Sequence, residues 1–99
     1  MENRKVLLMD LSIHLPYSSS LKDKRQIKRS LIQRLKNRFN ISIIESDAQE
    51  ESRILILSLA YVALTYYQAE LTKEKIINDV YDVIDFVNGQ IDNEVSEIL

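Results

Sequence analysis

The feature that most constrains the fold is a strict alternation of apolar residues near the start of the chain. Between Lys5 and Leu15 every second residue is large and apolar, and these residues are Leu7, Met9, Leu11, Ile13 and Leu15. The residues between them are Val6, Leu8, Asp10, Ser12 and His14. Because side chains of a strand point alternately to its two faces, residues 5–15 are predicted to form a strand with one fully apolar face.

Two further strands and one helix are predicted in the middle of the chain. After a serine-rich turn, Ser20 is predicted to cap a helix, and Asp23 completes a capping-box pattern three residues later. Apolar residues then recur about every fourth position down to Phe39, which is typical of an amphipathic helix. Residues 40–47 have the pattern of a short strand. Residues 53–64 are apolar on both faces, which indicates a buried central strand.

The last third of the chain predicts a second helix and a final strand. Residues 66–71 are predicted to be a connection, and Thr72 is predicted to cap the helix. Its apolar positions are Ile76, Ile77, Val80, Val83, Ile84 and Val87. Asn88 and Gly89 are predicted to end the helix, with the glycine in the left-handed conformation that commonly closes a helix. Residues 90–99 can supply one last strand.

The resulting order, βαββαβ, predicts a ferredoxin-like sandwich, which is an α+β fold. Two right-handed βαβ crossovers joined by a hairpin give a four-stranded antiparallel sheet of order 4-1-3-2, with both helices on one face. A chain of 99 residues is long enough for one hydrophobic core. Residues 1–99 are therefore predicted to form a single domain.

One face of such a sheet carries no helices, and in this chain that face retains apolar side chains. Its predicted members include Val6 and Leu8 of the first strand, with Ile54 and Ile56 of the third. A contiguous apolar patch of this kind is uncommon on the surface of a monomer. A homodimer or another protein partner is therefore expected to cover it.

Composition argues against several classes of function. The chain has no cysteine, which excludes disulfides, thiolate nucleophiles and cysteine zinc sites. Its only histidine, His14, lies about 13 Å along the strand from Asp10, too far to share a metal ion. The sequence contains no glycine-rich phosphate loop. We therefore expect a protein that is not an enzyme, with no catalytic residue, metal, cofactor or small-molecule substrate.

The start of the chain bears on its location. Residues 1–14 carry no long apolar stretch and include Asp10, so they resemble neither a secretory signal nor a membrane span. A cytoplasmic protein without membrane contact is expected.

The predicted first helix holds most of the positive charge. Between Lys22 and Arg38, eight basic residues against the single acid Asp23 give +7, and the other five basic residues against 14 acids give −9. At about 100° per residue, Lys24 and Lys28 project toward the apolar side of the helix. Four others form one outward row, which we call the basic ridge: Lys22, Arg25, Arg29 and Lys36.

Basic residues in a first helical turn are unfavourable by about 0.3–1 kcal/mol each, because they meet the positive end of the helix dipole. Amides at a helix start and adjacent lysines both attract anions, so this end could hold a phosphate and the ridge could follow a nucleic-acid backbone. The predicted binding residues are Ser20, Lys22, Lys24, Arg25, Lys28, Arg29 and Lys36. The alternative is a solvated helix face whose charges pair with acids elsewhere in the fold.

The run SLKDKRQIKRSLIQRLKNRFNISIIESDAQ, residues 20–49, resembles the signature region of the YlxP-like family, small bacterial proteins with a domain of unknown function. The resemblance extends over nearly the whole chain and implies a ferredoxin-like fold. Genes of that family commonly neighbour genes for translation initiation and ribosome maturation, which implies a ribosome-related role. In one departure, EESR follows Gln49 where the family typically carries a tryptophan.

Two functional hypotheses follow. The first is a non-enzymatic accessory module, associated with ribosomal RNA or a ribosomal particle, whose first helix contacts phosphates of a structured RNA with little reading of bases. The alternative is a homodimeric protein-interaction or regulatory module that uses the apolar open face of the sheet.

Overall fold

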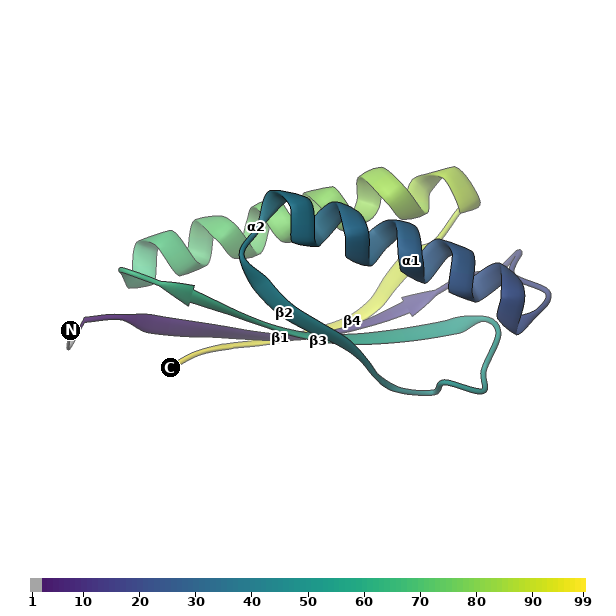
Figure 1. Ribbon diagram of the computed structural model, residues 1–99, viewed down its shortest axis with the longest axis horizontal. Coiled ribbons are helices and arrows are strands. Elements are labelled where there is room, and N and C mark those ends of the chain that lie inside the picture. Colours follow the sequence, from purple (N-terminus) through teal and green to yellow (C-terminus); the bar gives the residue numbers. More distant parts are fainter. Residues whose placement is uncertain (1–2) are drawn as a thin grey trace.

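A computed structural model of the chain describes residues 3–99, in which four strands form one sheet beneath two long helices (Figure 1). The elements in chain order are β1 (Lys5–His14), α1 (Leu21–Arg38), β2 (Ile41–Asp47), β3 (Ile54–Ala63), α2 (Tyr66–Ile84), the short 3₁₀ helix η1 (Asp85–Val87) and β4 (Gln90–Ile98). This is the predicted βαββαβ order.

The sheet is antiparallel throughout, with strand order β2-β3-β1-β4. Read from the opposite edge, this is the predicted order 4-1-3-2. Both helices lie on one face of the sheet, and the other face carries no helix (Figure 1). The ferredoxin-like α+β fold is therefore confirmed, with β1 and β3 as the two central strands.

The core lies between the sheet and the helices. All five apolar residues predicted to share one face of the first strand are buried, at no more than 1% exposure. The other buried hydrophobic residues are Leu31, Leu35, Ile43, Leu55, Leu57, Leu59, Ala63, Ala69, Ile76, Val80 and Ile84. Full burial of a large aliphatic side chain contributes about 1.5–3 kcal/mol, so the alternation in β1 determines which face of the sheet the helices cover.

The start of α1 follows the predicted cap. The Ser20 hydroxyl accepts a hydrogen bond from the backbone amide of Asp23 at 3.1 Å. The Asp23 carboxylate in turn accepts bonds from the Ser19 backbone amide at 3.1 Å and the Ser19 hydroxyl at 2.9 Å. These reciprocal bonds satisfy amides that the first helical turn would otherwise leave without partners.

The predicted start of α2 is wrong. The helix begins at Tyr66 and is capped by Thr65, whose hydroxyl accepts a bond from the Gln68 amide at 3.0 Å. The Gln68 side chain accepts a bond from the backbone amide of Leu64 at 2.6 Å, in the manner of a capping box. Residues 66–71 are therefore helical rather than a connection, and Thr72 is buried within the helix.

The end of the helical segment differs from the prediction in the residue that turns the chain. Asn88, with φ of 54°, adopts the left-handed conformation that had been predicted for Gly89. Gly89 is required for space instead, because an added Cβ would lie 2.8 Å from the Cβ of Ile84 and 3.3 Å from Cδ2 of Leu15.

We expect Gly89→Ala to lower the free energy of unfolding by about 1–3 kcal/mol, because its methyl group would overpack the contact with Ile84. Asn88→Gly should be close to neutral, since glycine adopts a positive φ without strain. Urea unfolding of both variants tests this. If Gly89→Ala left the free energy of unfolding unchanged, residue 89 would be able to move away from Ile84 without destabilising the fold.

Candidate nucleic-acid interface

The eight basic residues of α1 fall into two groups. Four of them are held in ion pairs with acids of neighbouring elements: Lys24, Lys28, Arg34 and Arg38. The four residues of the basic ridge make no ion pair within the described part of the chain, and all four are exposed.

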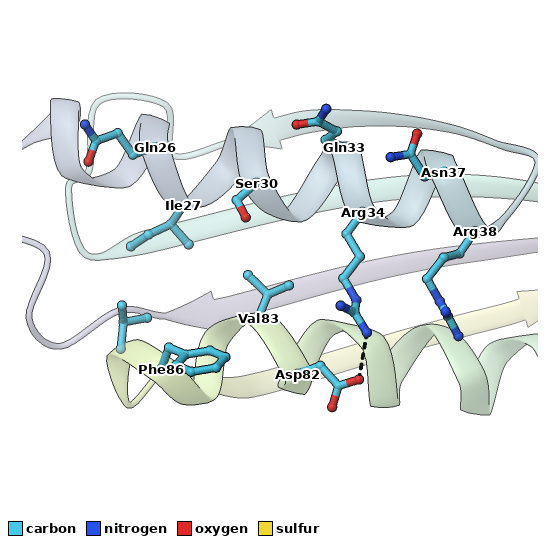
Figure 2. A pocket seen from close by; sticks show the side chains of 11 residues that line it. Gln26, Ile27, Ser30, Gln33, Arg34, Asn37, Arg38, Asp82, Val83 and Phe86 are labelled. Carbon is cyan, nitrogen blue, oxygen red and sulfur yellow. Dashed lines mark hydrogen bonds and ion pairs between the residues drawn. The ribbon is translucent and has the colours of Figure 1, made fainter.

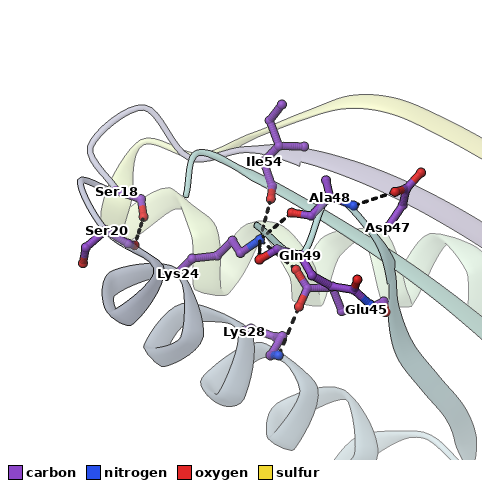
Figure 3. A network of polar contacts seen from close by, with 9 residues as sticks. All are labelled: Ser18, Ser20, Lys24, Lys28, Glu45, Asp47, Ala48, Gln49 and Ile54. Carbon is purple, nitrogen blue, oxygen red and sulfur yellow. Dashed lines mark hydrogen bonds and ion pairs between the residues drawn. The ribbon is translucent and has the colours of Figure 1, made fainter. Parts of the chain in front are cut away.

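Lys24 is 1% exposed and extends from α1 into the hairpin between β2 and β3 (Figure 3). Its ammonium group lies 2.8 Å from the carbonyl oxygen of Ala48, 3.1 Å from that of Ile54, 3.3 Å from that of Gln49 and 2.8 Å from Oε2 of Glu45. An ammonium has three donors, and these four acceptors satisfy all of them. Lys24 therefore links the first helix to the sheet.

Glu45 is shared between two lysines, because Lys28 Nζ lies 3.1 Å from its Oε1 (Figure 3). Burial raises the pKa of Glu45, but hydrogen bonds from Lys24 and Lys28 outweigh burial, and the net pKa is below the ordinary glutamate value of 4.5. A carboxylate with a lowered pKa stabilises the fold above its unfolded pKa, and this stabilisation is lost as the pH falls through the folded pKa.

Three members of the predicted anion-binding set are therefore corrected, and one of them is Lys28, whose ammonium is paired with Glu45. Lys24 is buried with its donors occupied, so it cannot reach an external phosphate. The Ser20 hydroxyl is engaged in the helix cap. Asp23 already places a carboxylate at this helix end, and bonds from the backbone amide and then the hydroxyl of Ser19 lower its pKa. This negative charge opposes a phosphate at the same position.

Arg34 and Arg38 reach from α1 to α2 (Figure 2). An Nη of Arg34 donates to Asp82 at 2.9 Å, and its Nε lies 3.6 Å from Asp79, which also pairs with Arg38. Asp79 is only 4% exposed, so this acid of α2 is buried beside α1 rather than solvated. These pairs neutralise the side of α1 that faces the second helix.

The basic ridge remains as a row of charge along the outer side of α1. From Lys22 to Lys36 there are 14 residue steps, or about 21 Å at 1.5 Å per residue. Arg25, Arg29 and Lys36 line a shallow hollow together with Lys28. Asp23 lies next to Lys22, but no acid lies between Arg25 and Lys36 in the sequence. Like-charged side chains along one helix face concentrate a positive potential that attracts a polyanion.

A second hollow, which sequence reasoning missed, lies between α1 and the end of α2 (Figure 2). We call it the interhelix groove. Ile27 and Ser30 line it from α1, Val83 lines it from α2, and Phe86 of η1 lies at its edge with 91% of its surface exposed. Phe86 does not follow the helical spacing of the core residues, and this is the one feature of the sequence that indicated an exposed aromatic residue here.

The open face of the sheet carries the four predicted residues Val6, Leu8, Ile54 and Ile56, paired across the two central strands with Val62, Ala60, His14 and Ser12. They are partly buried or only moderately exposed. Other aliphatic residues on this face are more exposed: Ile44, Val62 and Val95.

Polar side chains interrupt the apolar residues of this face on the two central strands. The Ser58 hydroxyl donates to Asp10 at 2.5 Å and contacts the Ser46 hydroxyl at 2.7 Å. Because Ser58 and Asp10 are opposite each other on the two central strands, the interruption lies in the middle of the sheet. The patch is therefore less continuous than the sequence predicted.

Metal sites and membrane-spanning helices are both absent from residues 3–99. No group of three or more histidine or acidic side chains in this range is placed to hold a metal ion. No helix in the same range has the length and apolar character needed to cross a bilayer.

The fold and the site together define a small ferredoxin-like α+β protein with a basic helix on its surface. The chain belongs to the DUF503 family, described as "Protein of unknown function", whose family model matches residues 6–98. None of the curated proteins matches the chain.

A solved structure with a similar fold is the crystal structure of a C-terminal segment of the alpha subunit of aIF2 from Pyrococcus abyssi. The TM-score is 0.60 and the sequence identity is 16%. The likeness covers 98% of this chain and 50% of that chain, so the chain spans about half the length of that structure. At this identity the likeness shows the fold alone.

We expect Lys24→Met to lower the free energy of unfolding by about 3–5 kcal/mol at neutral pH, because it leaves Glu45 and three carbonyl groups without their buried donor. The difference in the free energy of unfolding between Lys24→Met and the wild type should become smaller as the pH falls, because Glu45 becomes protonated in both proteins. Urea unfolding over a pH series measures both effects.

The neighbouring substitution Arg25→Met is the matched control. Arg25 is exposed and makes no ion pair with any of residues 3–99, so its removal should change the free energy of unfolding by no more than about 0.5 kcal/mol. Equal effects of the two substitutions would contradict the anchoring role of Lys24.

Proposed function

We propose that the protein is a non-enzymatic accessory module of the cytoplasm that binds RNA through its phosphate backbone, with the basic ridge as the contact surface. The observation that carries this proposal is the division of charge in α1. Lys24, Lys28, Arg34 and Arg38 form ion pairs with acids of neighbouring elements. The other four basic residues of α1, those of the basic ridge, share one outward face. A face that served only to neutralise acids of the same chain would not leave them unpaired.

The remaining charges favour binding on that side. The rest of the chain carries −9, and its acids include Asp82, Asp85, Asp92, Glu94 and Glu97 on α2, η1 and β4. A polyanion is repelled from these elements and attracted to α1. The charge distribution therefore both promotes association and orients it.

The proposed partner is ribosomal RNA or a ribosomal particle. The resemblance to the YlxP-like family supports this choice, because genes of that family commonly neighbour genes for translation initiation and ribosome maturation. The aIF2 segment contributes only the fold to this proposal, since its sequence identity is 16%. The charge pattern is the physical support.

A second candidate function is favoured by the open face of the sheet. Ile44, Val62 and Val95 are 55–65% exposed there, which is unusual for aliphatic residues on the strands of a monomer. We propose that a second copy of the chain covers this face. Such a homodimer would act as a protein-interaction module, and it is compatible with RNA bound on the opposite side.

For RNA binding, we expect affinity for a single-stranded RNA fragment to fall with salt, with a log-log slope of about −3 if all four ridge cations contact phosphates. Arg25→Glu combined with Arg29→Glu should abolish the binding, because it replaces two attractions with two repulsions. Fluorescence anisotropy across a salt series measures the slope. Co-sedimentation with ribosomal particles extends the test to the proposed partner.

A control must separate the effect of the ridge from the effect of net charge on RNA binding. Arg29→Glu alone is compared with Lys75→Glu, an equal charge change at an exposed lysine of α2. We expect the first to weaken binding and the second to leave it nearly unchanged. Equal loss in both variants would show that net charge, rather than the ridge, governs binding, and absence of binding at low salt would refute the proposal.

For the homodimer, we expect sedimentation equilibrium at micromolar concentration to give twice the chain mass of 11.6 kDa. Leu8→Glu, at a 38% exposed leucine of the open face, should give the single-chain mass. The matched control is Leu71→Glu, at a 41% exposed leucine of α2, which should leave the dimer intact. A wild-type protein with the single-chain mass would rule out this interface.

A further inference from the structure

We propose that the interhelix groove binds an unpaired base of single-stranded RNA, stacked on Phe86, while the basic ridge holds the adjoining phosphates. This inference rests on the proposed RNA-binding function and extends it from backbone contact to base contact. The sequence had favoured little reading of bases, because no aromatic pair is displayed on the central strands.

The shape of the groove supports one flat ligand. Ile27 and Val83 face each other across it, the ion pair between Arg34 and Asp82 bridges the two helices, and Asn37 and Arg38 line it beyond that pair (Figure 2). At the other end lies the ring of Phe86, which is 91% exposed (Figure 2). The ligand would therefore meet an apolar floor, a polar wall and an aromatic ring available for stacking.

Phe86 itself calls for an explanation. An aromatic side chain buries about 150–250 Å² when it is used in packing, and here it contributes almost nothing to the core. Stacking of a base on such a ring contributes about 1–3 kcal/mol per base and does not depend strongly on the base. Single-stranded nucleic acids bind to surfaces that combine an exposed aromatic ring with nearby cations, and here the ring lies in a groove on the α2 side of the helix that carries the basic ridge.

The groove is continuous with the ridge around the circumference of α1. Gln26, Ser30 and Gln33 lie roughly a quarter turn from the ridge, on the side toward α2, and all three line the groove. Their amide and hydroxyl groups can donate and accept hydrogen bonds at base edges. An RNA strand whose phosphates contact the ridge can thus cross this polar strip and bring a following base toward Phe86.

Charge also determines which part of a nucleotide enters the groove. On the far side, Asp82 is paired with Arg34, but Asp85 next to Phe86 is exposed and has no ion-pair partner within residues 3–99. Phosphates are repelled from this wall and held on α1, whereas an uncharged base can approach it. This polarity favours RNA with its bases unpaired over an acidic protein segment or a duplex.

The test uses the full chain and an RNA oligonucleotide that carries one 2-aminopurine, presented as a single strand or annealed to its complement. We expect the wild type to quench the 2-aminopurine of the single strand. Phe86→Ala should abolish this quenching and weaken single-strand binding by roughly 5-fold to 150-fold. Duplex binding should be unchanged in Phe86→Ala, because paired bases cannot enter the groove.

Two controls separate this inference from the proposed function. Tyr67→Ala removes another aromatic, 72% exposed at the start of α2, and should leave both affinities unchanged. Arg29→Glu should weaken single-strand and duplex binding alike. If Phe86→Ala binds the single strand as the wild type does while Arg29→Glu does not, the base site is wrong and the phosphate ridge stands. If the wild type binds neither RNA at low salt, both proposals fail.

Discussion

The interaction on which the rest of the structure depends is the buried contact of Lys24 with the β2–β3 hairpin. The Lys24 ammonium contacts four acceptors, and three of them are backbone carbonyls of the hairpin. Because these carbonyls belong to the backbone, the contact fixes the position of α1 relative to the sheet. Because residues of a helix are separated by about 100°, fixing Lys24 inward also fixes the outward direction of Lys22, Arg25 and Arg29. A buried charge thus orients the exposed ones.

Much of the fold was predictable because its strongest signals are local periodicities. The alternation in β1 and the four-residue spacing in α1 each identify a buried face without any knowledge of the partner element. The start of α2 was misjudged because Thr65 and Gln68 form a cap beside exposed tyrosines that do not follow the core spacing. The role of Gly89 was misjudged because it depends on Ile84 and Leu15, which only the folded chain brings near it.

In the candidate site, too, features that depend on local spacing were predictable, and features that depend on tertiary contacts were not. Helical spacing alone separated the basic ridge from Lys24 and Lys28, and the structure places all six side chains on the expected sides of α1. Spacing could not reveal that Lys24 is bonded to carbonyls of a distant hairpin. Nor could it reveal the groove, whose walls come from helices that are separated by two strands in the sequence.

The two surfaces proposed for binding lie on opposite sides of the molecule, since α1 covers one face of the sheet and the aliphatic residues lie on the other (Figure 1). A dimer formed through the open faces would direct its two basic ridges away from each other. A short RNA could not contact both ridges, so dimerisation would add little affinity for it. The same arrangement would allow one dimer to hold two separate RNA segments, which makes the two candidate functions complementary rather than exclusive.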